Sequence, residues 1–282
     1  MKLLIFLLFF MVKYPSPAPE DSVKVMTFNI RYGAADDGNN SWSNRKEILF
    51  DLIRKENADF VGLQESMIFQ IEEIIQQCPS YSYIGRTRQA DGTTGEATPI
   101  LYKTANYELI DQDTRWLSET PEVPESKSWD TSLPRIFTWA VFRRKADGKE
   151  IIVYNTHYDH LGETARYESS RVIVSHMNNH FRERDIVLLG DFNALEESKP
   201  ASYLTNNDLF RLSDTYRQLN PENKEEDMTF YGWNDHLPGT GRRIDYIFHA
   251  GDLDPVKAYV SNYHKGKRYP SDHMPVVAVF RY

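Results

Sequence analysis

The chain of 282 residues contains a single cysteine, Cys78. One cysteine excludes an internal disulfide framework and a cysteine-rich zinc site, and we expect Cys78 to be a small buried side chain on a helix. Lysine and arginine (33) are outnumbered by aspartate and glutamate (41), which gives a net charge of −8. This balance argues against a strong nonspecific grip on nucleic-acid backbones, because that grip comes from basic side chains. It does not exclude a nuclease, since a bound divalent cation and a local basic patch can offset the acidic total.

The chain also lacks an apolar run long enough to span a bilayer. The run from Leu3 to Val12 has ten apolar residues, and Lys13 and a proline-rich stretch follow it. Ten residues suit the core of a signal peptide better than a membrane span, although the small residues before Pro19 make a poor cleavage site. We expect residues 1–20 to be a signal-like segment of an exported protein, periplasmic or secreted. An uncleaved amino-terminal anchor is the alternative.

Residues 21–282 show no composition shift, repeat or long linker, so we expect one domain. Apolar residues recur at helical spacing in three segments: 45–55, 68–78 and about 164–184. Short apolar runs between them predict strands, and Asp147-Gly148 is typical of a hairpin turn. Hairpins mixed with β-α-β segments favour mixed sheets covered by helices. The loop from Tyr231 to Arg242 can shape a cleft or be plain surface.

Polar side chains stand at the ends of the predicted strands. The apolar run Ile186 to Leu189 leads into Gly190-Asp191-Phe192-Asn193. Because side chains alternate along a strand, Asp191 and Asn193 should point to the same side of the sheet. Taken alone this tetrapeptide can equally be a turn. Five other predicted strands, however, have polar residues within them or directly next to them. These residues are Asn29, Gln64-Glu65, Asn155-Thr156-His157, Asp245 and Ser271-Asp272-His273. Since burying so many polar groups is costly, the set indicates catalysis.

In this order the motifs resemble those of the endonuclease/exonuclease/phosphatase superfamily, in its deoxyribonuclease I-like and deadenylase-like branch. The resemblance covers roughly residues 23 to 282. It implies a four-layer α/β sandwich, with two mixed β-sheets packed face to face and helices outside. It also implies a hydrolase of phosphoric ester bonds that depends on Mg²⁺ or Mn²⁺.

The resemblance assigns the metal to Glu65, with Asn29 nearby and Asp272 contributing directly or through water. Carboxylate and amide oxygens are hard ligands that suit Mg²⁺ or Mn²⁺. A helix amino-terminal carboxylate for Glu65 and a turn cap for Asp272 are the structural alternatives. Asp191 matches the residue that orients or deprotonates the attacking water, and Asn193 the one that binds the scissile phosphate or orients that acid.

Two histidines and their partners complete the resemblance. His157 would polarise the phosphate or protonate the leaving oxygen, with Asp159 a possible orienting partner. His273 would contact the phosphate or act as the general base, and Asp245 would hold its tautomer or be a satisfied core residue. Arg135 resembles a phosphate-binding arginine, and Asn29 and His157 also lie on the predicted phosphate side. Weaker phosphate candidates are Arg31, Arg242 and Arg243, for which surface or ion-pair roles are equal alternatives.

We therefore expect a phosphodiesterase or nuclease-type hydrolase that attacks phosphate with an activated water. Alternatives are a phosphomonoesterase and a diesterase for lipid or sugar head groups. A catalytically inactive phosphate-binding module is a remote alternative, because Glu65, Asp191 and His273 are all present. The expected partner is a phosphate-ester substrate, with nucleic acid among the candidates. We expect a monomer without an obligate protein partner.

Overall fold

A computed structural model describes residues 21–281, except 223, 225–226 and 234–240. The signal-like segment 1–20 and much of the loop 231–242, including His236, lie outside the described residues. Within the described part, no helix is long and apolar enough to cross a membrane.

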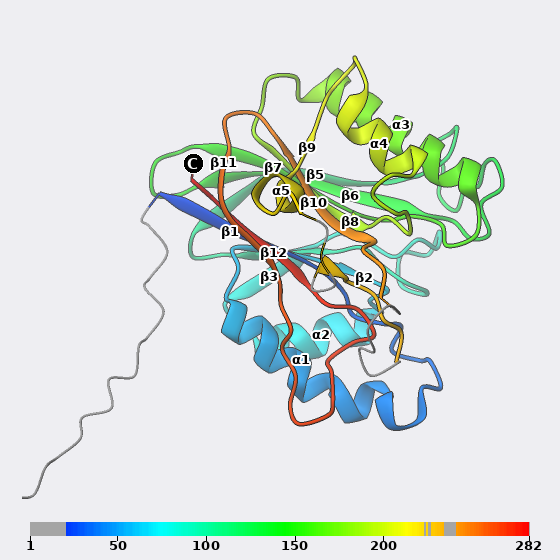
Figure 1. Cartoon of the computed structure of the whole chain (residues 1–282), viewed down its shortest axis with the longest axis vertical. Helices are drawn as coiled ribbons and strands as arrows, with labels where there is room; N and C mark the ends of the chain where they lie inside the picture. The colour runs from blue at the N-terminus through cyan, green and yellow to red at the C-terminus, as the bar shows by residue number, and fades with distance from the viewer. Residues whose placement is uncertain (1–20, 223, 225–226, 234–240, 282) are drawn as a thin grey trace, which may run out of the picture.

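Two six-stranded sheets form the centre of the molecule (Figure 1). The first has the order β11-β12-β1-β2-β4-β3. Its strands are β1 (Ser22–Asn29), β2 (Phe60–Gln64), β3 (Tyr81–Ile84), β4 (Ile100–Lys103), β11 (Asp254–Val260) and β12 (Val276–Arg281). The second has the order β5-β6-β7-β8-β10-β9. Its strands are β5 (Tyr107–Trp116), β6 (Ile136–Arg144), β7 (Glu150–His157), β8 (Ile186–Asp191), β9 (Ser213–Asp214) and β10 (Asp245–Ala250). Both sheets are mixed, because β1–β2 and β7–β8 are parallel and the other pairs antiparallel.

Helices cover the outer face of each sheet (Figure 1). The first sheet is covered by α1 (Trp42–Glu56) and α2 (Ile68–Gln77), and the second by α3 (Glu163–His180) and α4 (Lys199–Asn206). A short 3-10 helix, η1 (Gly38–Asn40), precedes α1, and α5 (Thr215–Leu219) precedes β10. The predicted four-layer sandwich is confirmed.

Three apolar layers hold the sandwich together, and strand alternation decides which residue enters which layer. On β1, Val23 and Val25 lie in the core between the sheets, whereas Met26 and Phe28 face the helices. On β8, Val187 and Leu189 lie between the sheets, and Ile186 and Leu188 pack toward α3 and α4. Continuing the same alternation carries the side chains at positions 29 and 191 into the gap between the sheets.

A polar tie joins the two sheets beside this gap. The Asn155 amide nitrogen donates to the backbone carbonyls of Leu63 and Pro99, each at 2.8 Å. Its oxygen accepts from Gln64 Nε2 at 2.6 Å. Gly62 makes room for the amide, since a Cβ there would lie 2.7 Å from Asn155 Oδ1. Gln64 and Asn155, both part of the motif series, therefore fix the sheets to one another.

Several predicted elements differ in detail from the observed ones. The third predicted helix ends at His180, before the expected Arg184. Cys78 is buried as predicted, but it is the residue that follows α2 and not part of the helix. The Asp147-Gly148 hairpin between β6 and β7 is present, and Gly148 has the left-handed φ of +78° that such a turn requires. Strands β5, β9 and β11 and helices α4 and α5 were not predicted.

Candidate active site

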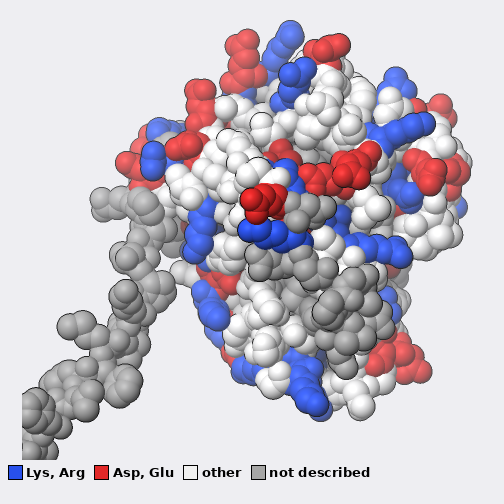
Figure 2. Space-filling model, viewed as in Figure 1, with Lys and Arg blue, Asp and Glu red and all other residues white. Residues whose placement is uncertain are grey.

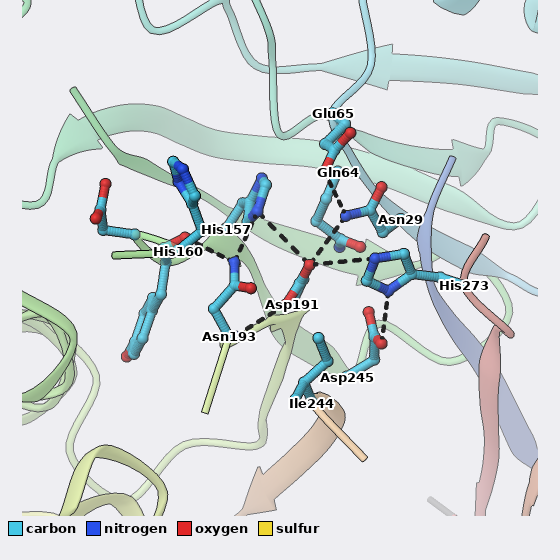
Figure 3. A network of polar contacts seen from close by, with 12 residues as sticks. Asn29, Gln64, Glu65, His157, His160, Asp191, Asn193, Ile244, Asp245 and His273 are labelled. Carbon is cyan, nitrogen blue, oxygen red and sulfur yellow. Dashed lines mark hydrogen bonds and ion pairs between the residues drawn. The ribbon is translucent and has the colours of Figure 1, made fainter. Parts of the chain in front are cut away.

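The Asp191 carboxylate lies at the centre of the gap between the sheets, at the end of β8 (Figure 3). Its Oδ2 accepts from Asn29 Nδ2 at 2.9 Å, and its Oδ1 accepts from the Asn193 backbone N–H at 2.9 Å. Imidazole nitrogens flank Oδ2 on two sides, His157 Nε2 at 3.5 Å and His273 Nε2 at 3.8 Å. Burial, with the nearby negative charge of Asp245, raises the pKa of Asp191 to about 7. A carboxyl group with such a pKa can accept a proton near neutral pH.

His273 and Asp245 form a buried pair beside Asp191. His273 Nδ1 lies 2.9 Å from Asp245 Oδ2, and the same oxygen accepts from Thr229 Oγ1 at 2.7 Å. Burial works against a charged imidazole, but the negative charges of Asp245 and Asp191 outweigh it and raise the pKa of His273 to about 10. His273 is therefore an imidazolium with one N–H on Asp245 and the other directed at Asp191. The contact predicted between Asp245 and His273 is present, and their catalytic roles stay predictions.

His157 lies in the opposite electrostatic environment. Arg135 Nη1 donates toward its Nδ1 at 3.1 Å, while Asn193 Nδ2 lies 3.1 Å from its Nε2. Burial and the positive charge of Arg135 hold the pKa of His157 well below its usual range. Because Nδ1 accepts from Arg135, the neutral imidazole carries its proton on Nε2, which can donate to a phosphate oxygen. A neutral imidazole does not suit the predicted alternative of protonating the leaving oxygen.

Asp159 acts on Arg135 and not, as the sequence suggested, on His157. Its Oδ2 accepts from the Ser132 hydroxyl at 2.6 Å and lies 3.5 Å from Arg135 Nε. Arg135 Nη2 also lies 3.1 Å from His160 Nδ1. Alternation does put Asp159 on the side of His157, but the longer guanidinium of Arg135 intervenes. Asp159 thus fixes Arg135, which in turn orients both histidines.

Glu65 and Asp272 provide the carboxylates on the side of the first sheet. Glu65 follows β2 in a left-handed conformation, with φ of +57°. Its Oε1 accepts from Asn29 Nδ2 at 3.1 Å and its Oε2 from the Tyr32 N–H at 2.9 Å. Asp272 Oδ2 lies 4.0 Å from Arg31 Nε. Burial and the charge of Glu65 raise the pKa of Asp272, as expected for two acidic groups that share one space.

This donor set fits Mg²⁺ or Mn²⁺, because two partly desolvated carboxylates in one cleft call for a cation. The Asn29 oxygen accepts from the Arg31 N–H at 3.0 Å, so its amide nitrogen links Glu65 to Asp191. Its part as a metal ligand stays a prediction. Among the described residues, donor atoms of Asp191, Asp245 and His273 also lie within 4.8 Å of one another. The positive His273 already neutralises that group, and we therefore favour Glu65 and Asp272.

A cleft of about 610 Å³ opens over these groups. Its wall includes Arg31, Arg242, Arg166 and Glu96. Of the residues above, the wall includes Glu65, Arg135, His157, His160, Asp191, Asn193, Asp272 and His273. Arg166, on α3, was missed because nothing in its spacing separates it from a solvent-facing helix residue. For Arg243 the ion-pair alternative holds, because its guanidinium is buried against Asp214 and Glu196, outside the cleft.

Comparison with known proteins bears directly on this arrangement. Residues 26–273 match the model of the Endonuclease/Exonuclease/phosphatase family. The chain belongs to this family. An endonuclease/exonuclease/phosphatase structure from Bacteroides vulgatus is 32% identical, with a TM-score of 0.85, and the match covers 92% of this chain and 98% of the other.

Two further structures of the endonuclease/exonuclease/phosphatase fold mark the range of the similarity. The mannosyl-6-phosphatase Bt3783 of Bacteroides thetaiotaomicron is 29% identical, with a TM-score of 0.79 and coverage of 91% and 98% of the two chains. The human Nocturnin catalytic domain, crystallised with a sulfate anion, is 17% identical, with a TM-score of 0.74 and coverage of 92% and 94%. That likeness concerns the fold alone. As a member of this family, the chain is a phosphoester hydrolase.

Proposed function

We propose that this protein is a divalent-metal-dependent phosphatase that hydrolyses the phosphate monoester of a sugar with an activated water. One observation carries the catalytic part of the proposal. A single amide, Asn29, bonds both Glu65 and Asp191, so that the proposed metal ligand and the proposed water-activating acid are held beside each other. Such a pairing suits an attack on phosphate, which needs charge neutralisation and an oriented nucleophile together.

Each of the site residues has a distinct role in this proposal. Glu65 and Asp272 hold Mg²⁺ or Mn²⁺, which when bound neutralises charge on the nonbridging phosphate oxygens. Asp191 orients the attacking water and accepts its proton, a role that its raised pKa supports. Asn193, neutral His157 and Arg135 bind the phosphate, and positive His273 stabilises the negative charge that develops there.

Two observations support a sugar monoester as the substrate. The relative named a mannosyl-6-phosphatase matches 91% of this chain at 29% identity. The net charge is −8, and acidic and basic side chains are interspersed on the face shown in Figure 2. An extended nucleic-acid track is instead expected to be basic.

The phosphodiesterase or nuclease activity expected from the sequence is the second candidate. The observation in its favour is the presence of four arginines in the cleft wall, Arg31, Arg135, Arg166 and Arg242, which can bind phosphates on either side of a scissile diester.

The deciding experiment measures phosphate release and chain cleavage with Mg²⁺ and with Mn²⁺. The substrates are hexose 6-phosphates, inositol phosphates, sphingomyelin, RNA, and single- and double-stranded DNA. We expect release of inorganic phosphate from a hexose phosphate, and its loss in Asp191→Ala and His273→Ala. Asp214→Asn, a change outside the cleft, is the matched control. Preferred cleavage of a diester would replace the first candidate with the second, and full activity in both alanine variants would refute the mechanism.

We also propose, from residues 1–20, that the protein is exported. Cell fractionation of the full chain tests this, and recovery solely in the cytoplasm would contradict it.

A further inference from the structure

Arg45, in the first turn of α1, is a buried arginine with unusual partners. Its side chain is 2% exposed, and the ring of Trp42 lies 5.1 Å from its guanidinium carbon. All of its hydrogen bonds go to backbone carbonyls, and among the described residues no carboxylate accepts one. A buried charge normally has a carboxylate partner, so this arrangement calls for an explanation.

The carbonyls come from segments that are far apart in the sequence. Nη1 donates to Ile30 O at 2.6 Å and to Pro270 O at 2.9 Å, while Nη2 donates to Arg31 O at 2.9 Å. Nε donates to Asn40 O at 3.0 Å. One guanidinium thus ties the turn after β1 to the segment that enters β12.

Both segments carry the groups of the proposed metal site. In the first, the Arg31 N–H bonds Asn29 and the Tyr32 N–H bonds Glu65. Arg31 has φ of +58°, a conformation that a residue with a side chain keeps only when its surroundings hold it. In the second, Pro270 directly precedes Ser271 and Asp272. The Ser271 hydroxyl lies 2.7 Å from Asn29 O and 3.2 Å from Asp272 Oδ1.

We propose that Arg45 is a positioning residue for the divalent metal, holding the 30–32 turn against Pro270 so that Glu65 and Asp272 face the same ion. It touches neither the ion nor the substrate, and the proposal rests on the proposed function. The planar fork of arginine is required, because a lysine ammonium cannot reach carbonyls on both segments in a fixed geometry.

The test is Mn²⁺ affinity, measured by titration calorimetry without substrate, in the full chain and its variants. We expect Arg45→Lys and Arg45→Met to weaken Mn²⁺ binding about 10- to 100-fold, the usual effect of losing a group that orients metal ligands. Added guanidinium should restore affinity in Arg45→Ala. Arg144→Met is the matched control, since Arg144 is also buried but bonds Asp147 at the far β6–β7 hairpin. This variant should bind Mn²⁺ as the wild type does.

Hydrogen exchange provides a second measurement for the variant that keeps the charge. In Arg45→Lys the Tyr32 amide should exchange faster, while the amides of β8 keep their protection. Wild-type Mn²⁺ affinity in the folded Arg45 variants, or an unchanged Tyr32 amide, would overturn the proposal even if the melting temperature fell. Glu65→Gln separates the metal assignment from the positioning role of Arg45. If it leaves Mn²⁺ binding intact, the metal assignment itself fails; if it abolishes binding while Arg45 variants bind normally, only the positioning role fails.

Discussion

Replacing Asp191 by asparagine should make the metal-free protein more stable and nearly inactive. The wild-type carboxylate is buried, and its pKa rises from 3.8 to about 7. Such a rise corresponds to about 4 kcal/mol of destabilisation at a pH above 7, at about 1.4 kcal/mol for each pH unit. Asparagine carries no charge, so the destabilisation from a buried carboxylate is lost. Its NH₂ group, however, faces the NH₂ group of Asn29, and these unpaired donors cost about 1–3 kcal/mol. The net gain in the free energy of unfolding is therefore about 1–3 kcal/mol.

The pH dependence of this gain is its distinguishing feature. Between pH 3.8 and about 7 the folded protein retains a proton on Asp191 that the unfolded chain releases. The stability of the wild type consequently falls as the pH rises through this window. The variant has no such proton, so its advantage should be present at pH 8 and absent at pH 4.

Urea unfolding in EDTA at the two pH values provides the measurement, and turnover with Mg²⁺ or Mn²⁺ the companion assay. We expect turnover to fall by about 10²- to 10⁴-fold with the loss of the proton acceptor. The idea that burial destabilises the ionised Asp191 would be refuted by either of two results. The variant could be less stable than the wild type at pH 8, or its gain in the free energy of unfolding could be the same at both pH values.

Three other predictions concern the site and His249, a buried histidine on β10. Asp245→Asn removes the charge beside His273, so the pKa of His273 should fall from about 10 toward its usual value, and turnover should drop about 10²-fold or more; an unchanged imidazole titration by NMR in EDTA would contradict this. Burial lowers the pKa of His249 from 6.5 to about 4, and since the unfolded chain binds the proton first, the wild type should lose about 2 kcal/mol from this group between pH 7 and pH 5. In urea unfolding, the loss of stability between pH 7 and pH 5 should be smaller in His249→Gln by about 2 kcal/mol. An equal loss in the variant and the wild type would exclude His249 as the source. Chelation should abolish phosphate release and added Mg²⁺ or Mn²⁺ restore it, with Glu65→Gln needing more metal; activity that survives chelation would remove the metal from the mechanism.

The sequence predicted the inner strands and the edge strand β3, but it did not predict the edge strands β5, β9 and β11. Inner strands such as β1 and β8 are apolar on both faces, because one face meets the other sheet and one meets helices. The edge strands β5 and β11 carry polar and charged residues along their exposed sides, as edges commonly do. Their sequences therefore lack the apolar run by which the inner strands were found.

The gathering of the site residues was predictable, whereas their protonation and support were not. Alternation along strands is enough to aim Asn29 and Asp191 into one gap. Nothing local to His157, however, indicates that Arg135 lies against it, and the left-handed turn at Glu65 is set by tertiary contacts. The sequence places Arg45 in a helix but does not indicate its positioning role, because its partner Pro270 is 225 positions away.

The Asn155 tie between the sheets has a consequence for how this protein loses activity. Glu65 belongs to one sheet and Asp191 to the other, so the reacting geometry exists only while the two sheets keep their register. Warming or pressure that shifts one sheet slightly against the other should abolish the enzymatic activity before the secondary structure unfolds. Activity is then a more sensitive gauge of inter-sheet alignment than circular dichroism, and Asn155→Leu should widen the interval between the temperature of inactivation and the temperature of unfolding.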